Sequence, residues 1–157
     1  MKRPSLQFSV PCLSVDEKSG PPSFSSIFYE LPFPKFPFKF PGRGFFIANS
    51  WCNGQGRFAQ EIKILKPDHK TDIMKTGKQP FELKEETTPF MAVNLFKDAV
   101  FEAPGTYWVQ ITLADSQGVL KVELEYPLVV RLADNAEAPS APAAKPASKP
   151  ASKPGRR

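Results

Sequence analysis

The sequence predicts an all-β protein, an antiparallel β-sandwich of seven to eight short strands followed by a disordered C-terminal tail. Apolar and polar residues alternate with a period of two in several stretches, which is the pattern of strands with one buried face. The 18 prolines and 9 glycines of the chain punctuate these stretches. We find no stretch with helical periodicity over more than about two turns. Short strands separated by turns favour two packed antiparallel sheets.

Two strands are expected before residue 32. Leu6, Phe8 and Val10 alternate with polar residues, and apolar residues resume beyond Pro11. Because proline has no donor for the strand ladder, we expect this strand at an edge or a bulge. A Ser-Gly-Pro-Pro turn follows, and residues 24–31 are the second expected strand.

The segment 31–46 has an unusual composition, with four prolines that exclude a helix and a central strand. Phe36, Phe38 and Phe40 recur at a period of two, so an extended chain places their rings on one side. The favoured interpretation is that the segment crosses an edge of the sandwich and inserts its rings into the core. The alternative is an exposed Phe-Pro ligand for another protein, since proline-fixed segments lose little entropy on binding.

The dipeptide Asn53-Gly54 predicts a hairpin, because both residues tolerate the positive φ of a tight turn. Phe46 then falls on a face with charged residues. Two amides, Asn49 and Gln60, fall on the core face and need hydrogen-bond partners if they are buried. The whole predicted core face consists of Phe45, Ile47, Asn49, Trp51, Gly56, Phe58, Gln60 and Ile62.

Strands are also expected at 81–83 and 88–96, before a closing hairpin of residues 106–114 and 119–130. If the loop has four residues, 115–118, every cross-strand pair on one face of the hairpin is apolar, from Tyr107 with Tyr126 to Leu113 with Leu120. A register in which Leu113 faces Lys121 mixes the two faces, so side-chain alternation argues against it. The other face carries Trp108, Gln110 and Glu125 among polar residues.

The folded part and the tail differ in charge. The net charge of +5 comes from 21 basic and 16 acidic residues, but no acid follows residue 138. We expect one domain at 1–132 and a disordered tail at 133–157, because Ala, Pro, Ser and Lys cannot bury enough surface to fold. The tail is either a linker or a weak, sequence-independent nucleic-acid tether with a salt slope no steeper than roughly −5. Its cations are Lys145, Lys149, Lys153, Arg156 and Arg157.

Reactive side chains are scarce. His69, the only histidine, lies in a predicted polar turn and is expected to be solvated instead of acting as a base. Cys12 and Cys52 are expected to be free thiols. The chain has no motif for a metal, a phosphate or a dinucleotide. We therefore expect no enzyme activity, with no catalytic residue, no metal and no cofactor.

No membrane association is expected. Polar residues interrupt the apolar N-terminal stretch too soon for a signal peptide. No run approaches the roughly 20 apolar residues of a membrane span. The expected location is therefore the cytoplasm.

Binding is the remaining class of function. Trp108 is a large aromatic residue on a polar face, which is typical of an interaction anchor unless a loop covers it. With Phe36 and Phe38 it is the candidate surface for an unidentified protein partner. A further alternative is a carbohydrate-binding sandwich, in which Trp108, Tyr29 and the Phe-Pro segment stack on sugars.

Two regions resemble a known family. Residues 101–130 carry Phe-x-x-Pro-Gly-x-Tyr before the closing hairpin, and residues 44–69 carry a Trp and a Gly-rich turn before a strand that ends in Lys-Pro-Asp-His. Over residues 5–131 the chain resembles a family of small bacterial proteins known only as a domain of unknown function. The resemblance implies an immunoglobulin-like sandwich from a bacterial cytoplasm and no catalytic residues. The Cys-Trp-Cys signature of antibody domains is absent, so the immunoglobulin likeness is architectural.

Overall fold

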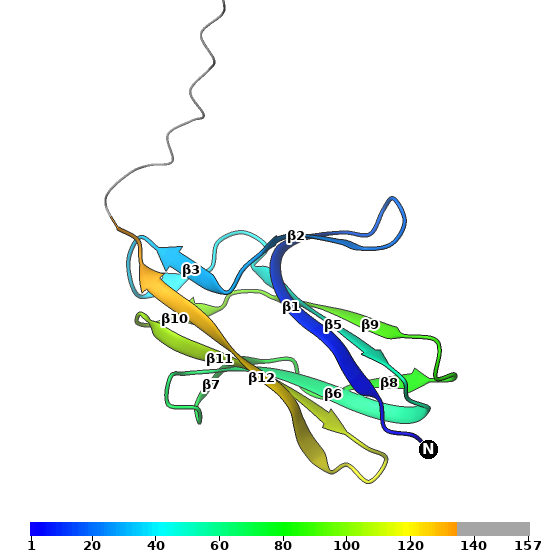
Figure 1. Cartoon of the computed structure of the whole chain (residues 1–157). Coiled ribbons are helices and arrows are strands. Elements are labelled where there is room, and N and C mark those ends of the chain that lie inside the picture. Colours follow the sequence, from blue (N-terminus) through cyan, green and yellow to red (C-terminus); the bar gives the residue numbers. More distant parts are fainter. Residues whose placement is uncertain (135–157) are drawn as a thin grey trace, which may run out of the picture.

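Figure 1 shows a computed structural model of the chain, which describes residues 1–134. These residues form two main sheets. The first sheet has the strand order β2 (Ser23–Ile27), β1 (Ser5–Asp16), β5 (Phe45–Cys52) and β9 (Phe90–Phe96). The second has the order β3 (Glu30–Phe33), β12 (Leu120–Leu132), β11 (Gly105–Ala114), β6 (Gly56–Leu65) and β7 (Asp72–Lys75), and β8 (Gln79–Leu83) also pairs with β6. A separate pair consists of β4 (Phe38–Lys39) and β10 (Val100–Phe101).

The all-β prediction is confirmed, but two details of it are wrong. The described residues form twelve strands instead of seven to eight. Four of these have only two to four residues, which is too short for a visible alternation. In addition, β3 pairs with β12 in parallel, so the sheets are not wholly antiparallel. The strand expected at 24–31 is divided between β2 and β3, which belong to different sheets.

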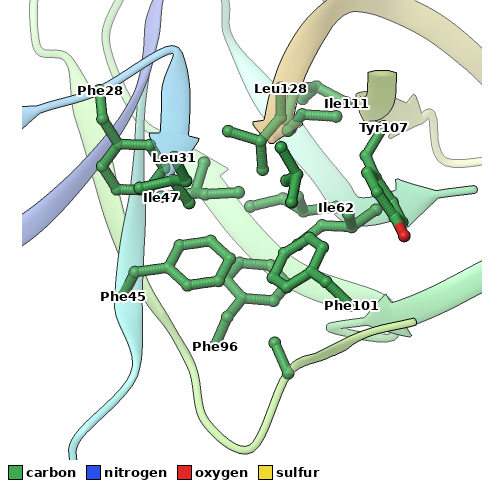
Figure 2. Packing of buried hydrophobic residues seen from close by; sticks show 14 of the residues in the cluster. Phe28, Leu31, Phe45, Ile47, Ile62, Phe96, Phe101, Tyr107, Ile111 and Leu128 are labelled. Carbon is green, nitrogen blue, oxygen red and sulfur yellow. The ribbon is translucent and has the colours of Figure 1, made fainter. Parts of the chain in front are cut away.

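The core lies between the facing sheets. Phe45 of β5 and Phe96 of β9 stack with ring centroids 5.5 Å apart. In Figure 2 these rings face the aliphatic side chains of Ile62, Ile111 and Leu128, which come from the second sheet. All five side chains are almost completely buried. Each stabilises the fold by about 1.5–3 kcal/mol relative to an exposed position.

Asn53-Gly54 does not close a hairpin, which corrects the prediction. β5 pairs with β1 and β9, whereas β6 pairs with β11, β7 and β8, so the turn carries the chain from one sheet to the other. Asn53 does have a positive φ of 58°. A Cβ on Gly54 would lie 2.6 Å from the Cβ of Pro4. The N-terminal segment can therefore lie against this turn only because residue 54 is glycine. The predicted core face is nevertheless largely right, because both strands turn the same side chains inward.

The two inward amides find partners across the sheets. The Trp51 indole N–H donates to Gln60 Oε1 at 2.7 Å, and Asn49 Nδ2 donates to the same oxygen at 3.3 Å. Gln60 Nε2 donates to Gln79 Oε1 at 2.9 Å. Asn49 Oδ1 is buried without a partner in the described part of the chain. This network ties β5 to β6, which share no ladder.

The closing hairpin is confirmed, with a different register from the predicted one. Ala114 pairs with Leu120, so the loop is one residue longer, and Leu113 does face Lys121. The pairing then shifts between Ile111 and Thr112, where Glu123 of β12 is an extra residue. Such a bulge moves the following side chains to the opposite face.

The bulge decides which residues of β12 reach the core. Beyond it Leu124, Tyr126 and Leu128 pair with inward residues of β11, and of these Tyr126 and Leu128 pack in the core whereas Leu124 is still 37% exposed. Before it, Leu120 and Val122 face outward and are 42% and 48% exposed, although the prediction placed both in the core. The sequence pattern did not reveal the bulge, because Leu120, Val122 and Leu124 alternate without interruption.

Strand β1 bends over the outer face of its own sheet. Phe24 of β2 pairs with Val15 of β1 but also lies edge-on to Phe8, with ring centroids 6.0 Å apart. In a straight strand, Phe8 and Val15 are separated by roughly 23 Å. The second half of β1 must therefore turn back, carrying β2 with it. Figure 1 shows this β1–β2 hairpin projecting above β5 and β9.

Candidate functional site

A groove of about 970 Å³ lies between the β1–β2 hairpin and the outer face of the first sheet. We call it the hairpin groove. On the sheet side it is lined by apolar residues, Phe46 of β5 with Met91 and Val93 of β9. The hairpin side consists of Ser14, Val15, Asp16, Glu17, Lys18 and Pro22, and Arg43 completes the lining.

Strand alternation places the apolar residues in the groove. Ile47 and Asn49 of β5 point into the core, so Phe46 and its alternate neighbours must point outward. Ala48 of β5 pairs with Val93, which faces outward as well. Met91, two residues earlier in β9, is 37% exposed. The sheet thus presents an apolar surface on the side opposite the core.

Arg43 reaches the groove because a glycine follows it. Gly44 has φ of +87°, and a Cβ at this position would lie 2.1 Å from the backbone oxygen of Phe96. Only glycine fits this approach, which brings the start of β5 against the end of β9. Arg43 forms no ion pair with any residue in 1–134, so its guanidinium is available to a ligand at the groove.

The chemistry of the groove suits binding. An apolar floor takes up apolar side chains, and methionine adapts its shape to them. The rim offers two carboxylates and two cations for polar flanks of the ligand. Among the described residues that line the groove there is neither histidine nor cysteine, so the lining lacks a base for nucleophilic catalysis of the Ser-His or Cys-His type.

Trp108 lies on the outer face of the second sheet, as predicted, and a loop partly covers it. The rings of His69 and Trp108 have centroids 4.2 Å apart with a 36° angle between their planes. His69 Nδ1 lies 3.1 Å from Glu125 Oε1, and Gln110 Nε2 donates to Glu125 Oε2 at 3.0 Å. Trp108 itself pairs with Pro127 instead of Glu125. His69 thus occupies part of the surface that Trp108 would offer a partner.

The loop between β6 and β7 is fixed in a way that holds His69 on Trp108. Asp68 Oδ1 accepts hydrogen bonds from the backbone N–H groups of Lys70 and Thr71, and its Oδ2 accepts one from the Thr71 hydroxyl. These hydrogen bonds stabilise the carboxylate and lower the pKa of Asp68 to about 2. The turn allows His69 a positive φ of 60°. The predicted solvated histidine is thus in contact with the sheet.

Phe36 and Phe38 pack against the core, as the favoured interpretation of the Phe-Pro segment states. With Phe40, both rings lie around the buried Phe33, and Phe38 stacks on it with centroids 3.9 Å apart. The three rings are half-buried. Their role in partner binding stays a prediction.

The structure does not bring Trp108 together with the Phe-Pro segment. Tyr107 points inward and contacts Phe101, which in turn contacts Phe33. Tyr107 therefore lies on the same side of the second sheet as Phe38, which stacks on Phe33. Trp108, its neighbour in β11, points to the opposite side of the sheet. Tyr29, which is 77% exposed, precedes β3, and β12 separates β3 from β11. Trp108 and the Phe-Pro segment, two parts of the supposed sugar platform, therefore lie on opposite sides of the second sheet.

The cysteines are free thiols, as predicted. Cys12 is buried, and burial raises the pKa of its thiol. Within residues 1–134, no group of three or more His, Cys, Asp or Glu side chains is placed to hold a metal ion. The same part of the chain has no helix long and apolar enough to cross a membrane.

The tail prediction falls outside the described residues. These end at Asp134, so the boundary expected at 132 and the five tail cations stay predictions from sequence. The five cations are Lys145, Lys149, Lys153, Arg156 and Arg157.

Comparison with known proteins identifies the family. The sequence profile of a family of unknown function, DUF6941, matches residues 7–131. The chain belongs to this family. Neither the curated proteins nor the solved structures include a significant match to it.

The site of this DUF6941 chain was only partly visible in its sequence. Sequence reasoning placed Phe46 on the outer face but missed Arg43, Met91 and Val93. One signal was present: β9 reads Phe-Met-Ala-Val-Asn-Leu-Phe and has no polar face. A strand that is apolar on both faces is expected to be covered on both. The overhanging hairpin is not visible in the sequence, because it depends on the bend of β1.

Proposed function

We propose that this DUF6941 domain is a non-catalytic protein-interaction module that holds an apolar segment of a partner protein in the hairpin groove. The observation that carries the proposal is the apolar floor of Phe46, Met91 and Val93 on the side of the sheet opposite the core. Nearby positions on that side, Cys12 and Ala48, are completely buried. The groove is therefore the part of this surface that the protein's own hairpin leaves accessible.

The rim supports a polypeptide as the ligand. Asp16 and Glu17 on the hairpin side and Arg43 on the sheet side carry opposite charges around an apolar floor. A protein segment supplies apolar side chains together with backbone and charged groups that pair with such a rim. Methionine and phenylalanine are also enriched in interfaces.

Trp108, Phe36 and Phe38 stay in the proposal as secondary contacts. The Trp108 ring is half-buried and shares its surface with His69, so a partner there must displace His69 or bind beside it. The same contact disfavours a sugar platform on Trp108. The nucleic-acid alternative rests on the basic tail alone.

We also propose an architecture and a cellular location for the domain. Two facing sheets with a shared core support an immunoglobulin-like description. The free thiols of Cys12 and Cys52 support a reducing location, for which we propose the cytoplasm of a bacterium.

The proposal is tested with peptides selected on the full chain from a random library displayed on phage. Their affinities are then measured by fluorescence polarisation for the unaltered protein and for Phe46→Glu, whose carboxylate enters the apolar floor. We expect Phe46→Glu to weaken binding at least about tenfold, because a charge buried without a partner costs more than 1.4 kcal/mol.

The matched control is Val122→Glu, which places the same charge on an exposed apolar position of the second sheet. Peptides that bind both variants as tightly as the unaltered protein would exclude the groove. Loss of binding in Trp108→Ala together with full binding in Phe46→Glu moves the site to the second sheet.

A further inference from the structure

Strand β9 is an edge strand that lacks the usual protection against strand pairing. It pairs with β5 on one side through seven consecutive residue pairs without a register shift. It ends the strand order of its sheet, so its other side is unpaired in the described structure. Its seven residues contain no charge and no proline. Unprotected edges of this kind pair readily with another strand.

Five other strand edges of residues 1–134 carry a protective feature. Proline interrupts β3 and β8, at Pro32 and Pro80. Ser26 of β2 has a positive φ. The pairing of β7 with β6 has a register shift, and β7 begins with Asp72 and ends with Lys75. The free segment of β12 is bulged at Glu123, which is held by Arg3. Because β9 lacks all of these features along its seven residues, its edge is suited to pairing with another strand.

The exposure of β9 also indicates missing cover. Met91 and Leu95, both outward, are 37% and 47% exposed. An uncharged strand with apolar outward residues at an open edge is costly in water unless a partner covers it. We propose that β9 pairs antiparallel with β9 of a second copy of this chain, joining the two first sheets into one continuous sheet. This inference goes beyond the proposed function and does not rest on it.

The strand is complementary to itself. In a two-fold register centred on Val93, Val93 faces its own copy and Met91 faces Leu95 of the other copy. Phe90 faces Phe96 in the same register. Every pair involving these residues is apolar, so the register sets no like charges opposite each other. The two-fold axis makes the contact closed, because each copy has only one such edge.

The charges at the two ends of β9 support this orientation. Residues 82–86, which precede the strand, contain three Glu and one Lys. At the other end Lys97 follows the strand directly and Arg43 lies beside it, while the next residue, Asp98, already forms an ion pair with Lys39. Antiparallel pairing brings the basic end of each copy next to the acidic end of the other. Glu86 and Glu82 already form ion pairs with Lys2 and Arg57, which leaves Glu85 for the partner's Lys97. Neither Glu85 nor Lys97 has an ion-pair partner within residues 1–134.

The test is the mass of the full chain in solution, measured by sedimentation velocity from low micromolar to near-millimolar concentration. We expect a reversible, concentration-dependent dimer. Val93→Lys sets two ammonium groups opposite each other at the centre of the contact and is expected to raise the dissociation constant at least about tenfold. Val122→Lys, on the exposed β12 tip, should leave it unchanged. A chain that stays monomeric throughout the range overturns the proposal.

A cross-link keeps the test decisive if Val93→Lys unfolds. Directly opposite residues of an antiparallel pair have Cα atoms about 4.5–5.5 Å apart, which suits a disulfide. In a Cys52→Ser background, Val93→Cys should therefore oxidise to a dimer on a non-reducing gel, whereas Val122→Cys should not. Cross-linking through residue 122 and not 93 assigns the contact to β12 and contradicts the proposal.

Discussion

The Trp51 indole donates a 2.7 Å hydrogen bond to Gln60 Oε1, and both side chains are completely buried. The bond crosses from β5 in the first sheet to β6 in the second, which are consecutive in the chain but share no ladder. Gln60 also accepts from Asn49 and donates to Gln79. A single amide therefore accepts hydrogen bonds from two groups of the first sheet and donates one to Gln79 of its own sheet.

Replacing Gln60 is expected to destabilise the fold strongly. Gln60→Leu leaves the Trp51 N–H and the Asn49 amide without an acceptor, and each buried unsatisfied group costs about 1–3 kcal/mol. We expect the free energy of unfolding to fall by about 3 kcal/mol in urea denaturation. Asn49→Leu is the matched control, because it removes the buried Oδ1 that has no partner and should cost less than Gln60→Leu. Equal losses for both variants would contradict a central role for Gln60.

Tyr126 is expected to make stability depend on alkaline pH. Burial raises its pKa from 10.0 to about 12, even though the Ser9 hydroxyl contacts its OH at 3.1 Å. A raised pKa in the folded state means that unfolding releases the proton above pH 10. The contribution of the protonated Tyr126 phenol to the free energy of unfolding is thus fully present below pH 10 and is lost as pH rises to about 12.

The variant Tyr126→Phe isolates this effect. Between pH 9 and pH 11 the unaltered protein should lose about 1.4 kcal/mol more of its unfolding free energy than Tyr126→Phe does. Urea denaturation at each pH measures the difference. Tyr29→Phe, which removes a hydroxyl from an exposed ring, is the control. Parallel curves for the unaltered protein and Tyr126→Phe would show that the buried phenol does not cause the alkaline loss.

His69→Ala is expected to uncover Trp108. Removing the imidazole exposes the ring face that lies 4.2 Å from it. The tryptophan emission should shift to longer wavelength and become more sensitive to acrylamide, and the change belongs to Trp108 because Trp51 is completely buried. Unchanged quenching would mean that His69 does not cover Trp108 in solution. Asp68→Ala, which releases the turn that holds His69, should produce the same shift in part.

The nucleic-acid alternative makes its own prediction. If residues 135–157 bind DNA, removing them should abolish a weak, sequence-independent affinity of the full chain. The logarithm of that affinity should fall with log salt at a slope no steeper than roughly −5, since the tail has five cations beyond residue 138. Fluorescence anisotropy with a DNA duplex of random sequence measures both the affinity and its dependence on salt. Identical binding by the full chain and by residues 1–134 would remove the tail from consideration.

Side-chain alternation predicted which residues are buried better than it predicted which strands pair. Phe45, Ile47, Ile62 and their neighbours were assigned to the core correctly although β5 and β6 do not form the expected hairpin. The reason is physical: two strands that point the same side chains inward fill a core equally well across a ladder or across two sheets. Pairing depends on long-range contacts that no local pattern encodes.

The candidate site was the harder part to predict. Trp108 was placed on the correct face, and its covering by a loop was an alternative that did not say which loop. The hairpin groove needed two features that local pattern does not carry, the bend of β1 and the approach of Gly44 to Phe96. The apolar outward residues of β9 were readable, but their neighbours in space were not.

The most direct test of the groove uses the methionine methyl groups. The chain has three methionines, of which Met91 lines the groove, while Met74 packs against the core and Met1 is exposed at the terminus. A two-dimensional spectrum of the protein labelled with ¹³C at the methionine methyls is recorded while a library-selected peptide is added. We predict that the Met91 signal shifts and that the Met74 signal does not. A peptide that binds without moving Met91 contradicts the proposed site.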